Sequence, residues 1–287
     1  MVHKKAPMPS SHPEPPERKL FRLEGKGVHS KPNLVEGGAF SGKVLKGAGR
    51  QFSRKEVFST KRACELYQKA LIDAGIPILP AKVKVAGSGN RWRLYFIQDY
   101  VPQNQILSNV FAGARPEKCL RLTSELLSNA KKAFDSRKKS NVLFGMDVNF
   151  HNWVLSGNQL VFLDFYVPPI KEKGSFDRAL FTGVDSRLVK AGLLALYPRQ
   201  QRRRYDPKRI VLAVLGTAIQ YRPELEREIL ELGRRFVAEN FSGRERAFLF
   251  GRMKSAQALV QPTLLGKAAM ALERRKKRKI ASQKQAN

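Results

Sequence analysis

Apolar residues along this chain follow two different periods, and the order of these periods restricts the folds it can adopt. Over the first hundred residues they occur in short runs between glycine-rich turns, as is typical of β-strands. One helical segment interrupts them at residues 54–74, where Ser53 and Glu56 have the spacing of a capping box. Further on, helical spacing dominates, apart from a strand-like hairpin at residues 153–163. This order predicts an α+β fold with a small strand-rich part and a larger helical part.

Local signals locate the other elements and the boundaries. A hairpin is expected around Gly87 and Gly89, and the glycine at position 75 followed by a proline at 77 ends the long helix. Short strands are expected at 20–23, 33–35 and 43–45, hairpin strands at 81–85 and 91–100, and helices at 116–138, 185–196, 207–220, 223–241 and 243–257. The expected domains are a flexible segment at 1–19, a strand-rich lobe at 20–101, a helical lobe at 102–272 and a basic tail at 273–287.

The charge of the chain is strongly unbalanced. Its 287 residues include 54 Lys and Arg against 24 Asp and Glu, a net charge of +30, and most of the excess lies between residues 20 and 270. Such a charge favours polyanionic partners and disfavours a cationic ligand such as an aminoglycoside. No apolar run is long enough to span a membrane. Cys64 and Cys119 cannot form a disulfide framework, so buried reduced thiols and a cytoplasmic location are expected.

One segment carries a set of oxygen-bearing side chains at distinctive spacing. Asp147 and Asn152 are five positions apart, and Asp164 follows the apolar hairpin. A loop followed by a tight hairpin would bring the three side chains to one cleft. Two carboxylates and an amide are suited to binding Mg²⁺ and to receiving a hydroxyl proton. The segment therefore predicts a site suited to a metal ion and to proton transfer from a hydroxyl.

This pattern resembles the catalytic segment of the protein-kinase-like superfamily, especially its aminoglycoside-phosphotransferase, lipopolysaccharide-kinase and RIO-like branch. The resemblance implies a two-lobed kinase-like fold that uses ATP and Mg²⁺. Asp147 would orient and deprotonate the acceptor hydroxyl, while Asn152 and Asp164 would bind the metal. Asn149 would either assist in positioning phosphate or make the turn. Gly145 replaces the loop histidine of the family, and a tyrosine replaces the glycine after the Asp164-Phe motif.

Further residues match the family in order along the chain. Lys46 is the first choice for the strand lysine that contacts phosphates, with Lys43 as the alternative, and Glu65 is the helix glutamate that would pair with it. Gly25 and Gly27 resemble a phosphate-covering loop, although a simple turn explains them equally well. Gln98 and Tyr100 resemble the hinge that meets adenine, or else a plain strand end. His151 is expected to serve in hydrogen bonding within the loop.

Two functions remain open from the sequence. The first is an ATP- and Mg²⁺-dependent phosphotransferase acting on a hydroxyl of an anionic or nucleic-acid-associated acceptor; a ribonucleoprotein, lipopolysaccharide, anionic lipid or acidic protein fits the charge. The second is a kinase-like scaffold without turnover that binds RNA, ribosomal particles or an anionic membrane surface. Basic clusters at residues 197–209 and 274–279 suit either function. The three retained residues Asp147, Asn152 and Asp164 favour the enzyme.

Overall fold

The computed structural model describes residues 19–22, 32–48, 51–89, 91–138, 142–166, 168–172 and 205–253. Its helices and small antiparallel sheets make it a mixed α and β protein, as predicted. Two compact units can be distinguished: Met1–Glu65 with Leu79–Val101, and Leu66–Ile78 with Pro102–Asn287. The predicted Gly25 and Gly27 loop, the helix at 185–196, most of the basic cluster at 197–209 and the basic tail lie outside the described residues.

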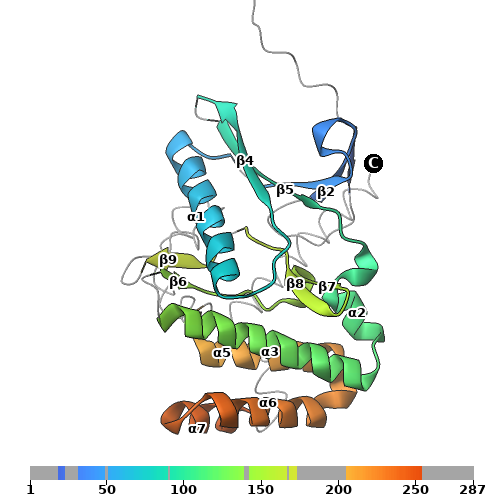
Figure 1. The fold of residues 1–287 in the computed structure, drawn as a ribbon, viewed down its shortest axis with the longest axis vertical. Helices are drawn as coiled ribbons and strands as arrows, with labels where there is room; N and C mark the ends of the chain where they lie inside the picture. Colours follow the sequence, from blue (N-terminus) through green and yellow to red (C-terminus); the bar gives the residue numbers. More distant parts are fainter. Residues whose placement is uncertain are drawn as a thin grey trace, which may run out of the picture. The chain divides into compact units, whose positions relative to one another are not determined.

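The first unit is built on a five-stranded antiparallel sheet, with strand order β1-β2-β3-β5-β4. Strands β2, β4 and β5 of this sheet are labelled in Figure 1. Its buried side includes Val83, Leu94 and Phe96. In the β4–β5 hairpin, Gly87 has a φ of +145°, and a Cβ there would lie 2.2 Å from the Arg91 carbonyl oxygen, so a larger residue would clash. The strands are β1 (Lys19–Arg22), β2 (Pro32–Glu36), β3 (Lys43–Gly47), β4 (Lys82–Ser88) and β5 (Arg91–Asp99).

Helix α1 (Arg54–Asp73) begins at the predicted capping box. The Ser53 hydroxyl lies 3.4 Å from the Glu56 backbone nitrogen, and the Glu56 carboxylate accepts a 3.0 Å bond from the Ser53 backbone N–H. The helix ends at Gly75, which has a φ of +70° and donates its N–H to the Ile72 carbonyl. Two of its buried residues, Val57 and Cys64, belong to the first unit. The later part of the helix, from Leu66 onward, belongs to the second unit.

The second unit is mainly helical. Helix α3 packs against α5 and α6, and α7 packs against α5 and α6 (Figure 1). Two two-stranded antiparallel sheets, β6–β9 and β7–β8, complete the unit. The elements are α2 (Leu107–Gly113), α3 (Pro116–Lys138), β6 (Val142–Phe144), β7 (Trp153–Ser156), β8 (Gln159–Phe162), β9 (Ile170–Glu172), α5 (Pro207–Tyr221), α6 (Glu226–Asn240) and α7 (Gly243–Arg252), with short 3₁₀ turns at Gln103–Gln105, Phe150–Asn152 and Pro223–Leu225. Another 3₁₀ turn, Gly38–Phe40, belongs to the first unit.

The structure departs from the predicted elements at three places. The helix expected at 223–241 starts as a 3₁₀ turn, and the regular helix α6 begins only at Glu226. Helix α2 has seven residues and was not predicted. The pairing of β6 with β9 was also missed, because each strand has three residues and Leu143 pairs with the distant Lys171. Such short elements carry too little periodicity to be recognised in the sequence alone.

Candidate functional site

The loop between β6 and β7 contains Asp147, Asn149 and Asn152, and its own side chains hold it in place. The Asn149 backbone N–H donates a 3.0 Å bond to Asp147 Oδ1, and the His151 backbone N–H donates a 3.1 Å bond to Asn149 Oδ1. The Trp153 indole donates a 3.1 Å bond to the Asp147 carbonyl. Such side-chain to backbone bonds are typical of Asx turns. Asn149 therefore makes the turn, while the Asp147 side chain lies exposed at its start.

The β7–β8 hairpin brings Asn152 close to Asp164. Trp153 pairs with Phe162 at the end of the ladder, and the Leu163 N–H continues it with a 3.0 Å bond to the Asn152 carbonyl. Asn152 is thus opposite Leu163, the neighbour of Asp164 in the chain. Asp164 is half-buried, and its Oδ1 accepts a 3.3 Å bond from the Tyr166 backbone N–H. This register brings the backbones of Asn152 and Asp164, the two predicted metal-binding residues, to neighbouring positions of one hairpin.

An aromatic cluster surrounds the backbone on both sides of Asp164. The fully buried Tyr67 ring of α1 lies 6.3 Å from the Phe162 ring and 6.4 Å from the Phe165 ring, edge to face in both cases. Its hydroxyl donates a 3.1 Å bond to the carbonyl of Gly145, the residue that replaces the family's loop histidine. Tyr67 thus supports the start of the loop and the Asp164 segment together. Tyr67 was not predicted as a site residue from the sequence, although its place on the buried face of α1 was the available signal.

The His151 ring makes hydrogen-bond contacts with residues outside the loop, whereas hydrogen bonding within the loop was expected. Its Nδ1 lies 2.8 Å from the hydroxyl of the buried Ser108, and its Nε2 lies 3.4 Å from the Tyr221 hydroxyl. The preceding Phe150 stacks on the Tyr221 ring, with centroids 5.3 Å apart and planes at 10°. These contacts attach the loop to α2 and α5.

In the first unit, Lys46 and Lys43 occupy different faces of β3. Lys46 is half-buried and directly opposite Phe96, so it shares the face of the buried Gln98, whose side-chain amide donates a 3.1 Å bond to the Leu79 carbonyl. Lys43 is on the other face and forms an ion pair with Asp99. The choice between Lys46 and Lys43 as the phosphate-contacting lysine therefore stays a prediction.

The structure does not form the expected pair between Glu65 and Lys46. The Glu65 carboxylate lies on the exposed side of α1 and pairs with Lys61 one turn earlier, at 3.1 Å. The buried side of the helix at this level carries Cys64 and Gln68 instead. Tyr100, the other predicted hinge residue, is exposed.

The donor set of the second unit fits Mg²⁺ only in part. Among the described residues, no group of three or more His, Cys, Asp or Glu side chains could hold a metal ion. Mg²⁺ is usually held by one or two carboxylates together with substrate phosphates and water. Asp164 and Asn152 supply one carboxylate and one amide oxygen, which are donor types that Mg²⁺ accepts.

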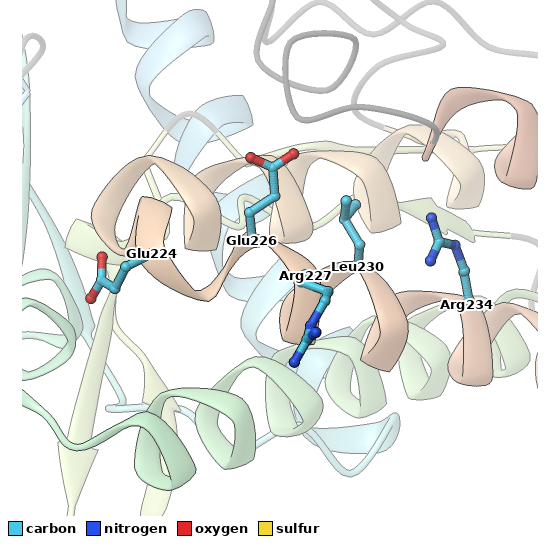
Figure 2. Close-up of a pocket in the computed structure, with 5 residues that line it drawn as sticks. All are labelled: Glu224, Glu226, Arg227, Leu230 and Arg234. Atoms are coloured by element: carbon cyan, nitrogen blue, oxygen red, sulfur yellow. The ribbon is translucent and has the colours of Figure 1, made fainter.

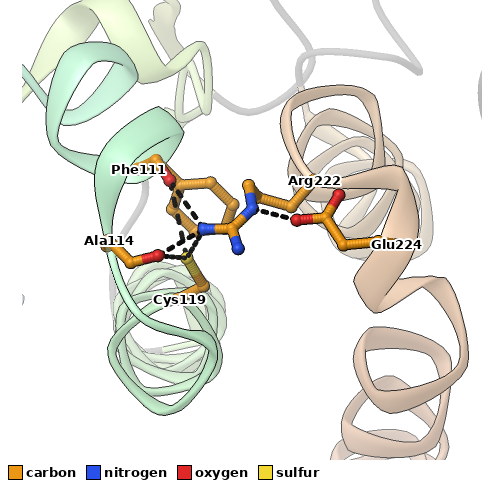
Figure 3. A network of polar contacts seen from close by, with 5 residues as sticks. All are labelled: Phe111, Ala114, Cys119, Arg222 and Glu224. Carbon is orange, nitrogen blue, oxygen red and sulfur yellow. Dashed lines mark hydrogen bonds and ion pairs between the residues drawn. The ribbon is translucent and has the colours of Figure 1, made fainter.

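Two other polar features of the second unit lie outside this loop. Arg222 binds the carbonyls of Phe111 and Ala114, the Cys119 sulfur at 3.1 Å and the Glu224 carboxylate (Figure 3). This network joins the end of α5 to the α2–α3 connection, and burial raises the pKa of the Cys119 thiol. An open hollow on α6 contains none of the predicted site residues (Figure 2); its lining residues are Glu224, Glu226, Arg227, Leu230 and Arg234.

Comparisons with known proteins assign the chain to a family whose function is unknown. None of the helices in the described ranges is long and apolar enough to cross a bilayer. A search of curated proteins finds no match. The family described as "Family of unknown function (DUF6206)" matches residues 22–262, well over half of the chain. The chain therefore belongs to the DUF6206 family.

Proposed function

We propose that this protein is an ATP- and Mg²⁺-dependent phosphotransferase acting on a hydroxyl of an anionic or nucleic-acid-associated acceptor. The observation that supports it best is the hairpin register in which Asn152 lies opposite Leu163, the residue before Asp164. Asp147 lies at the start of the same hydrogen-bonded loop. Its side chain is exposed, and a group that contacts an acceptor must be accessible. The net charge of +30 favours an acceptor of negative charge.

The residues take separate roles in this proposal. Asp147 orients the acceptor hydroxyl and takes its proton while the oxygen bonds to the γ-phosphorus and the bond to the β–γ bridging oxygen breaks. Asn152 and Asp164 hold the metal ion, which neutralises charge on the phosphates when it is bound. By resemblance to the kinase-like superfamily, Lys46 contacts the phosphates, and Gln98 and Tyr100 lie in the adenine-binding segment.

A second function has an observation of its own. Glu65 pairs with Lys61, so the lysine–glutamate pair of active kinases is not formed with this glutamate. Gly145 and Tyr166 also replace residues that active members of the superfamily use. These features support the alternative of a kinase-like scaffold without turnover that binds a polyanion through its basic surface.

A nucleotide-dependent thermal shift separates the two functions. ATP with Mg²⁺ at 100 times its dissociation constant should stabilise the folded protein by about 2.7 kcal/mol. We expect Asp164→Asn to abolish this shift, and Asp147→Asn to keep the shift but lose transfer of the γ-phosphate. Asp73→Asn, which alters an exposed carboxylate paired with Lys69, is the matched control. A wild-type protein without any shift, or an Asp164→Asn variant with the full shift, would refute the enzyme proposal.

A further inference from the structure

The β4–β5 hairpin carries four cationic residues on one face. Directly opposite residues of an antiparallel pair point to the same side of a sheet, as do alternate residues along each strand. Lys84 is opposite Tyr95, Ala86 is opposite Arg93 and Ser88 is opposite Arg91. This alternation assigns one set of residues to the same side, here called the basic hairpin face: Lys82, Lys84, Arg91, Arg93 and Tyr95.

The basic hairpin face is exposed over most of its length, although Ile97, which is opposite Lys82 on this side, is buried. Val83, Leu94 and Phe96 alternate with its residues and are buried on the opposite side. Trp92 also lies on that opposite side, where its ring packs 5.7 Å from the Phe58 ring of α1. Helix α1 therefore covers the other side, and all four cations are exposed.

No acidic side chain neutralises these cations within the described residues. None of the four makes an ion pair there, and the hairpin between residues 82 and 98 contains no Asp or Glu. The nearest acidic residue in the register, Asp99, is already paired with Lys43. Exposed cations without counter-charges create a positive potential that attracts polyanions.

Tyr95 adds an aromatic ring to this charged surface. It is half-buried, and its neighbour on β3 is Gly47, which has no side chain to cover the ring. A Cβ on Gly47 would lie 3.7 Å from the Tyr95 ring. Aromatic rings between cations are the usual means by which proteins stack the bases of single-stranded nucleic acids.

The same surface is poorly suited to a membrane. Peripheral binding to a bilayer requires exposed apolar side chains that insert among the lipids, in addition to positive charge. Among the described residues, the exposed large apolar side chains all lie outside the β4–β5 hairpin: Phe58, Leu66, Ile72, Tyr100, Phe248 and Phe250.

We propose that the basic hairpin face binds single-stranded nucleic acid, with phosphates on the four cations and a base stacked on Tyr95. Alternate residues of a strand lie about 7 Å apart, so the cations form two short rows along the hairpin. This proposal does not depend on phosphotransfer, since none of the five residues belongs to the candidate site.

The test is fluorescence anisotropy of a labelled 20-nucleotide oligouridylate with the full chain over a series of NaCl concentrations. Each phosphate contact adds about 0.7 to the slope of log affinity against log salt for single strands. The double variant Lys84→Gln, Arg93→Gln should lower that slope by about 1.4. The matched control Lys55→Gln, Arg62→Gln removes the same charge from exposed positions of α1 and should leave the slope unchanged.

The ring is tested separately from the charges. Tyr95→Leu should weaken binding about tenfold or more with an unchanged salt slope, whereas Tyr95→Phe should bind like the wild type. Absence of binding, or equal losses in the hairpin and control double variants, would overturn the proposal. Binding to phosphatidylserine vesicles that depends on Lys84 and Arg93, without binding to the oligouridylate, would assign this face to a membrane and overturn it as well. Thermal melts of all variants verify that they fold.

Discussion

Gly233 of α6 packs tightly against Leu215 of α5, and its replacement by alanine tests how much space this contact leaves. A Cβ at this position would lie 2.5 Å from Cδ1 and 3.0 Å from Cδ2 of Leu215, and 3.2 Å from the Met253 sulfur. Leu215 and Met253 are fully buried, so neither side chain can turn into solvent. The added methyl group must therefore displace core atoms or separate the helices.

Two opposing effects determine how much Gly233→Ala changes the free energy of unfolding. Alanine is preferred over glycine in a helix by about 1 kcal/mol. Overpacking a dense core by one methyl group costs about 1–3 kcal/mol. We therefore expect Gly233→Ala to lower the free energy of unfolding by about 1 kcal/mol. The matched control is Gly251→Ala in α7, an exposed helical position where a Cβ would meet no atom within 4 Å, and it should be stabilised by up to about 1 kcal/mol.

The measurement is urea and thermal unfolding of both variants, followed by circular dichroism. In a protein of this size, 1 kcal/mol corresponds to a change in Tm of about 2–4 °C. Adding Leu215→Val to Gly233→Ala should recover part of the loss, because it removes a methylene group at the clash. If Gly233→Ala and Gly251→Ala were stabilised equally, the packing argument would be refuted.

Three further predictions concern a helix cap, a buried hydrogen bond and two buried thiols. Ser53→Ala should lower the free energy of unfolding by about 1 kcal/mol by removing the helix cap, whereas Ser53→Asp should retain most of the wild-type stability. A urea unfolding curve of Ser53→Ala that matches the wild type would contradict this prediction. Tyr67→Phe should cost about 1 kcal/mol by removing the hydrogen bond to Gly145, which a denaturation curve will show or disprove. Cys64 and Cys119 are fully buried, and burial raises the pKa of the Cys119 thiol, so both should react with Ellman's reagent only after unfolding; labelling of the native protein between pH 7 and 9 would be the contrary result.

Local chemistry made several elements predictable. Both ends of α1 are set by residues close in the chain: the capping box of Ser53 and Glu56 at the start, and the glycine at position 75 at the end. The predicted helix therefore ended within one residue of the observed end of α1. Helix α3 likewise begins and ends where its apolar spacing indicates. The β6–β9 pair could not be found in this way, because it depends on contacts between residues almost thirty positions apart.

By itself, the sequence determined the mixed α and β composition, the spacing of Asp147, Asn152 and Asp164, and the positive charge, because these depend on residue types and short-range order. Only the tertiary structure decided which side chains become neighbours. It joined Asn152 to Leu163, and it placed Tyr67 against Phe162 and Phe165.

The same reason explains why the expected pair between Glu65 and Lys46 is not formed. Glu65 was expected to pair with Lys46, but it faces outward on α1 and forms an ion pair with Lys61. Lys43, the alternative lysine, forms an ion pair with Asp99. The face that a helix or strand buries depends on what packs against it. That choice is a property of the whole core and is not encoded in the spacing of a few residues.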